Sequence, residues 1–106
     1  MRLVIVESPF AGDVENNIIY ARRAVRDCVL RGEAPIASHL LFTQPGILDD
    51  NDPIQRRQGI ECGLAWCSVA DLSVVYIDLG ISHGMQNGIQ RAKALGVPVE
   101  YRTIGV

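Results

Sequence analysis

A nearly continuous apolar run, Leu72-Ser-Val-Val-Tyr-Ile77, is followed by a short polar turn and then by a helical pattern from Ser82 to Leu95. A strand with apolar residues at successive positions buries both of its faces, which is typical of parallel sheets. Parallel neighbours must be joined by a long crossover, usually a helix. The run therefore predicts a parallel sheet with helices on both of its faces.

The rest of the chain repeats this alternation. Further strands are predicted at Leu3–Val6, Ala34–Ser38 and Val97–Tyr101, where Pro98 marks an edge. Helices are predicted after the N-caps Asp13 and Asp52, the second one running through the apolar residues Ile60, Leu64 and Cys67. Residues His39 to Pro53 are expected to form a long loop, more often a lid or binding loop than a plain connection. The pattern predicts one α/β domain over residues 1–106, a three-layer fold with a four-stranded parallel sheet.

Composition narrows the function classes. The 106 residues are enough for one modest core, and 48% are hydrophobic. A net charge of −2 gives no basic surface for duplex nucleic acid. No apolar run approaches the ~20 residues of a membrane span, and Met1–Val6 is too short for a signal peptide. The three cysteines lack metal-binding spacing, so we expect reduced thiols, a cytoplasmic location, no metal and no cofactor.

Small and polar residues follow the predicted strands, at the edge where open α/β sheets bind ligands. Gly12 permits close backbone approach, and the helix that begins after Asp13 favours an anion at its N-terminus. Asp78 could hydrogen-bond a ribose-type diol or act as a base, and His39 is placed at the same edge. Purely structural alternatives stay open: a turn carboxylate for Asp78, a helix cap for Ser82 and a structural side chain for His39.

Five short motifs occur in a specific order. They are Ser8-Pro-Phe-x-Gly12, Tyr20-Ala-Arg22, Ser38-His39-Leu, Ala70-Asp71 and Gly84-Met85-Gln86-Asn87-Gly88. Together they resemble the nucleoside 2-deoxyribosyltransferase-like superfamily, which includes deoxynucleoside 5'-monophosphate N-glycosidases, and most of all its small branch often found in bacteriophages. The resemblance covers nearly the whole chain.

The resemblance implies a flavodoxin-like fold and cleavage of the bond between a base and a deoxyribose. It implies a nucleoside or nucleotide as the small-molecule partner, and a homodimer or higher homo-oligomer in which a partner subunit completes the pocket. Together with their positions at the sheet edge, it makes ligand-binding candidates of Ser8, Pro9, Phe10, Gly12, Asp13, Tyr20, His39, Gly80, Ser82, Gly84 and Met85.

Gln86 is the main departure from the family pattern. In the catalytic relatives the last motif reads roughly Gly-Met-Glu-Leu-Gly, and its glutamate attacks the anomeric carbon. A carboxamide at this position cannot form the glycosyl ester. One hypothesis is therefore an enzyme that uses another carboxylate, with Asp78 first and Glu61, Glu7 or Asp13 as alternates. The second is a catalytically inactive module that binds or sequesters a nucleotide, and the third is a structural or interaction protein on the same fold.

Overall fold

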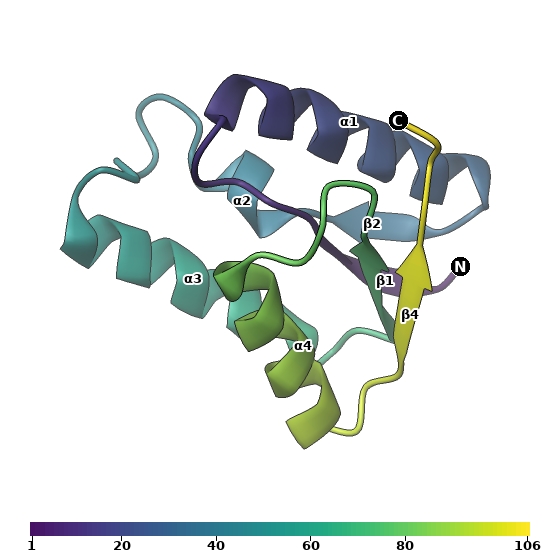
Figure 1. The fold of residues 1–106 in the computed structure, drawn as a ribbon. Helices are drawn as coiled ribbons and strands as arrows, with labels where there is room; N and C mark the ends of the chain where they lie inside the picture. Colours follow the sequence, from purple (N-terminus) through teal and green to yellow (C-terminus); the bar gives the residue numbers. More distant parts are fainter.

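The computed structural model describes residues 1–106 and contains one four-stranded sheet in which every strand pair is parallel (Figure 1). Its strands are β1 (Leu3–Glu7), β2 (Ala34–Ile36), β3 (Leu72–Tyr76) and β4 (Val99–Arg102). Their order across the sheet is β2-β1-β3-β4, so the two strands with the most buried residues lie in the centre. The predicted α/β fold with a four-stranded parallel sheet is confirmed.

Helices cover both faces of the sheet. α1 (Val14–Leu30) lies on one face, and α3 (Pro53–Cys67) and α4 (His83–Ala94) lie on the other (Figure 1). Each begins at the predicted cap: the side chains of Asp13, Asp52 and Ser82 accept hydrogen bonds from backbone N–H groups of the first turn. None of the helices combines the length and the hydropathy of a membrane-spanning segment.

The core is divided between the two faces. Beneath α1, Val4 and Val74 pack with Tyr20 and Cys28 in a cluster of nine buried residues. Beneath α3 and α4, two smaller clusters form around Met85 and around Cys67, Ala92 and Val97. Full burial of one valine or methionine side chain contributes about 1.5–3 kcal/mol to the free energy of unfolding. The face under α3 and α4 therefore has the thinner core, and this is the face that is hollowed.

Three details differ from the predicted elements. Residues Ser38–Leu41 form the short helix α2 where the end of a strand and a loop were predicted, so His39 lies on a helix. β4 starts at Val99, because the Pro98 nitrogen cannot donate to a ladder. On α3 only Cys67 is buried, because Ile60 and Leu64 line a cavity instead of packing against the sheet.

A buried ion pair joins the two edges of the sheet beneath α1. The guanidinium of Arg102, at the end of β4, donates to both carboxylate oxygens of Glu33, just before β2, at 2.7 and 2.8 Å. Both side chains are almost fully buried, and Arg102 also contacts the hydroxyl of Tyr76. The hydrogen bonds from Arg102 lower the pKa of Glu33 below the usual range, which keeps the carboxylate charged.

Candidate functional site

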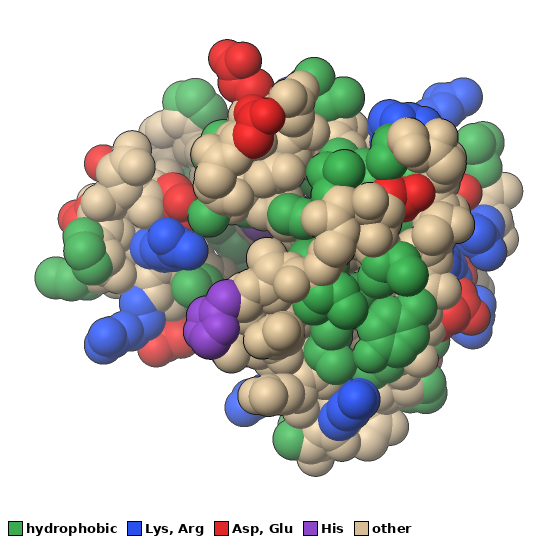
Figure 2. All heavy atoms as spheres, in the orientation of Figure 1, with side chains coloured by type: hydrophobic (Ala, Val, Ile, Leu, Met, Phe, Trp, Pro, Cys, Tyr) green, Lys and Arg blue, Asp and Glu red, His purple; other side chains and the backbone are tan.

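A cavity of about 360 Å³ lies at the carboxyl end of β1, with walls from the loop after β1 and from α2, α3 and α4. Its position agrees with the general rule for open α/β sheets, and its volume is within the range of small-molecule sites. Figure 2 shows the hollow, with a histidine side chain (purple) at its rim. We refer to it as the deep cavity.

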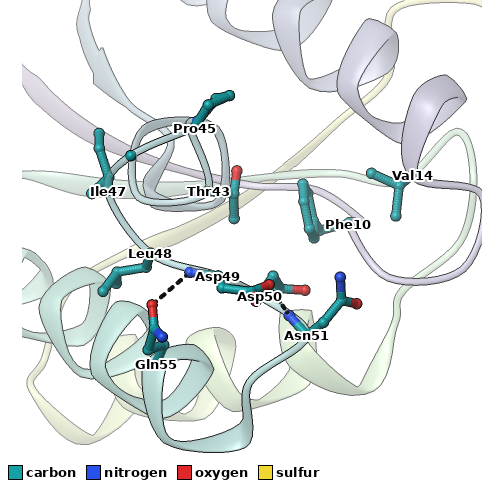
Figure 3. A pocket seen from close by; sticks show the side chains of 11 residues that line it. Phe10, Val14, Thr43, Pro45, Ile47, Leu48, Asp49, Asp50, Asn51 and Gln55 are labelled. Atoms are coloured by element: carbon teal, nitrogen blue, oxygen red, sulfur yellow. Dashed lines mark hydrogen bonds between the residues drawn. The ribbon is translucent and has the colours of Figure 1, made fainter.

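A second hollow, of about 580 Å³, adjoins the deep cavity on its outer side. Figure 3 shows it between Phe10, which follows β1, and the loop that joins α2 to α3. This loop is fastened to α3 because the Asp49 N–H donates to the Gln55 side-chain oxygen at 2.8 Å. Five residues line both hollows: Phe10, Thr43, Leu48, Asp50 and Gln55. The long predicted loop therefore lines a second hollow, which shares part of its wall with the deep cavity.

A serine–histidine pair lies in the wall of the deep cavity. Ser8 Oγ and His39 Nε2 are 2.6 Å apart, and the ring of Phe10 meets the His39 ring edge-on, with centroids 6.4 Å apart. Burial lowers the pKa of His39 to about 4, so the imidazole is neutral at pH 7. The pair therefore offers a neutral hydrogen-bonding edge to a ligand and carries no charge.

Glu7, the last residue of β1, also lines the deep cavity. Its carboxyl group packs against the backbone of Gly88 on α4, so closely that a Cβ atom at position 88 would overlap it. Burial, with no hydrogen bond to compensate for it, raises the pKa of Glu7 to about 8. The carboxyl group of Glu7 is therefore mainly protonated and neutral at pH 7.

Two cationic features lie beside the deep cavity. The N-terminus of α4 contributes Ser82, His83 and Gly84, and a helix N-terminus favours a bound anion. Arg56, in the first turns of α3, lines the cavity as well. An anionic group of a ligand would be stabilised between them. No group of three or more His, Cys, Asp or Glu side chains is placed to hold a metal ion.

The structure brings part of the predicted residue set together. Of the predicted ligand-binding residues, six line the deep cavity: Ser8, Phe10, His39, Ser82, Gly84 and Met85. They come from the segments that follow β1, β2 and β3, as the positions of these segments at one sheet edge predicted.

The other predicted residues lie outside the lining of the deep cavity: Pro9, Gly12, Asp13, Tyr20, Glu61, Asp78, Gly80 and Gln86. Asp78 and Tyr20 do meet, but they bond to each other at 2.6 Å on the α1 side. Gln86 and Glu61 are exposed on α4 and α3. Gln86 is exposed because α4 turns Met85 and Gly88 inward, which leaves position 86 on the outer face.

Several lining residues were not selected from the sequence, among them Asn87 and Gly88. Helical spacing contains a signal for them, because positions 84, 87 and 88 lie on one face of α4. Glu7 was named only as an alternate carboxylate. Its place at the end of a buried strand was visible in the sequence, but its close packing against Gly88 was not.

The strand order and the cavity at the carboxyl edge place this chain among the flavodoxin-like α/β proteins. The chain belongs to the family described as domain of unknown function DUF7768, whose family model matches residues 2–102.

A solved structure with a similar fold is a 2-deoxyribosyltransferase from the psychrotolerant bacterium Bacillus psychrosaccharolyticus. The TM-score is 0.66 and the sequence identity is 18%, over 95% of this chain and 72% of that chain. This likeness confirms the fold that the sequence motifs implied. A comparison with curated proteins found no match.

Proposed function

We propose that the deep cavity binds a nucleoside or nucleotide and that the protein cleaves the bond between its base and its deoxyribose. The observation that carries this proposal is the convergence of Ser8, His39 and the start of α4 on one cavity of about 360 Å³ at the carboxyl edge of the sheet. The similarity in fold to a 2-deoxyribosyltransferase supports the choice of substrate class.

The two hollows divide the ligand between them in this proposal. The sugar occupies the deep cavity beside the Ser8–His39 pair, which can hydrogen-bond its hydroxyl groups, and the bond between sugar and base lies within reach of Glu7. The base extends past Phe10 toward the outer hollow (Figure 3). A 5'-phosphate lies between Arg56 and the N-terminus of α4, where the charge and the free N–H groups favour it.

A specific observation favours a second candidate, a module that binds a nucleotide without cleaving it. Gln86 stands where the catalytic relatives of the sequence resemblance have their glutamate nucleophile, and it is uncharged and exposed, outside the cavity lining. The cleaving enzyme requires another carboxyl group, whereas the binding module requires none.

Chromatographic detection of free base, after incubation with a panel of deoxy- and ribonucleosides and their 5'-monophosphates, separates the two candidates. Released base supports the enzyme. A rise in the thermal unfolding midpoint with no release supports the binding module. If no member of the panel raises the unfolding midpoint and none releases free base, both candidates are contradicted.

Neighbouring arginines on α3 provide a matched control for the phosphate position. Arg56 lines the deep cavity and Arg57 does not, although both are exposed. Arg56→Gln is expected to weaken binding of monophosphates and to leave nucleoside binding unchanged. Arg57→Gln should change neither.

A further inference from the structure

We infer that Glu7 is the catalytic acid of this site, and that it donates a proton to the base as the base–sugar bond breaks. This inference rests on the proposed function and deepens it, because it assigns the chemistry to a carboxyl group on β1 in place of position 86 on α4. Gln86 is exposed outside the cavity lining, whereas Glu7 lines the cavity.

The Glu7 carboxyl group lies against α4. Gly88 has no side chain, and this allows the carboxyl group to lie directly against the α4 backbone. No protein donor or cation bonds to it, so burial raises its pKa to about 8. A buried carboxylate that is ionised is normally held by hydrogen bonds or an ion pair, and Glu7 has neither. The site is instead built to hold a neutral acid, which is a poor nucleophile and a good proton donor.

The reaction balances with water as the only co-reactant. The bond between the anomeric carbon and the base nitrogen breaks, and its electron pair stays on the base. The proton of Glu7 goes to the base, which departs neutral, and the resulting Glu7 carboxylate lies beside the cationic sugar and stabilises it. Water then adds its hydroxyl to the anomeric carbon and returns its proton to Glu7.

Other titratable groups also face the cavity. They are His39 on α2, Arg56 and Cys67 on α3, His83 on α4 and Asp50 in the α2–α3 loop. Burial lowers the pKa of His39 to about 4, and burial together with the nearby Glu7 raises the pKa of Cys67 above its usual 9.0. A loss of activity near pH 8 would therefore report Glu7 rather than His39 or Cys67.

The test compares Glu7→Gln with the wild type in the free-base assay, with kcat and KM measured separately. The amide has the shape of the protonated acid but cannot donate an acidic proton. We expect kcat to fall by about 10²–10⁴-fold, because this is the usual contribution of a general acid, with little change in KM. Glu15→Gln, on the exposed first turn of α1, is the matched control and should leave both constants unchanged.

A pH profile of the wild type provides a second measurement that does not depend on a folded variant. The value of kcat/KM should fall tenfold per pH unit above about pH 8. A ¹³C NMR titration of the labelled Glu7 carboxyl group in the free protein should show the same midpoint. Cys67→Ser should retain this alkaline limb.

The outcomes separate the two levels of the proposal. The role of Glu7 would be overturned if a folded Glu7→Gln released base within about threefold of the wild-type rate. It would also be overturned if the wild-type rate stayed flat above pH 8. Either result would leave the proposed function intact. Absence of base release by the wild type would overturn the cleavage itself, and the role of Glu7 with it.

Discussion

The Asp78 carboxylate accepts hydrogen bonds from the Tyr20 hydroxyl at 2.6 Å and from the backbone N–H groups of Ile104 and Gly105 at 3.0 and 2.9 Å. Desolvation raises its pKa, but these hydrogen bonds outweigh that effect and lower the pKa to about 2. Asp78 therefore links the segment after β4 to Tyr20 on α1. This contact fills the hydrogen-bonding capacity that a ligand diol would need, and the assignment of Asp78 to catalysis stays a prediction.

Asp78→Ala is expected to lower the free energy of unfolding by about 2–3 kcal/mol, because it removes three hydrogen bonds to one charged group. Tyr20→Phe keeps the ring but removes one of these donors and also the acceptor of the Asp78 N–H, so it should lower the free energy of unfolding by about 1–2 kcal/mol. Urea denaturation of both variants checks the order. Equal stability of Asp78→Ala and the wild type would show that the segment after β4 is held by other contacts.

At the scale of helices and strands, the sequence was sufficient for the sheet and for most of the helix starts. The apolar run of β3 and the caps Asp13, Asp52 and Ser82 are local signals, and the structure follows them. α2 was not predicted, because a helix of four residues has too few positions for a period to show. The cavity lining was predicted in part, since strand ends locate the edge of the sheet but not which helix face turns toward it.

Gly88 on α4 illustrates this limit, and it leads to a test. The substitution Gly88→Ala would place a Cβ atom on the Glu7 carboxyl group, whereas a Cβ atom at Gly84 would find only Ser82 Oγ at 4.0 Å. Gly84→Ala is expected to stabilise the protein by up to about 1 kcal/mol through helix propensity. Gly88→Ala has the same gain in propensity, but the Glu7 carboxyl group must shift to make room, so this variant should be less stable than Gly84→Ala.

The same pair of variants has a second readout at Glu7. In Gly88→Ala the carboxyl group must move toward water, so its pKa should fall from about 8 toward its ordinary value. An NMR titration of the carboxyl group measures this change, and Gly84→Ala should leave the pKa of Glu7 unchanged. Gly88→Ala with an unchanged pKa of Glu7 would show that α4 does not hold the carboxyl group in its buried position.

For the whole molecule, two shifted groups determine how stability depends on pH near neutrality. Glu7 keeps its proton in the folded state up to about pH 8 but loses it near 4.5 when unfolded, so its contribution to stability falls as pH rises between these values. His39 has the opposite sign between pH 4 and 6.5, because the unfolded state binds the additional proton. Between pH 6.5 and 8 the effect of Glu7 is no longer offset by that of His39.

The wild type should therefore lose up to about 2 kcal/mol of unfolding free energy between pH 6.5 and pH 8, or about 1.4 kcal/mol per pH unit. Glu7→Gln should lose almost none, because its amide does not titrate. Urea denaturation at the two pH values measures the difference. A decline of equal size in both proteins would assign it to another group.

Several expectations about the molecule and its surroundings stay predictions: the homo-oligomer, the cytoplasmic location and the occurrence in bacteriophages. Figure 2 shows apolar side chains gathered over β4 and the turn after β3, and Ile77, Leu79, Ile81 and Tyr101 are exposed there. Such a patch would be covered in a dimer of the kind that the sequence resemblance implies.

The ion pair between Glu33 and Arg102 has a consequence for how the protein is made. Arg102 follows Glu33 by 69 residues, so the ribosome adds it much later. In the folded protein the only other arginine bonded to the Glu33 carboxylate is the largely exposed Arg2. An uncompensated buried charge costs about 3–5 kcal/mol, so a nascent chain without β4 gains little from closing the sheet. We therefore expect a chain that ends before Arg102 to unfold more easily than the full chain and to be cut faster in limited proteolysis.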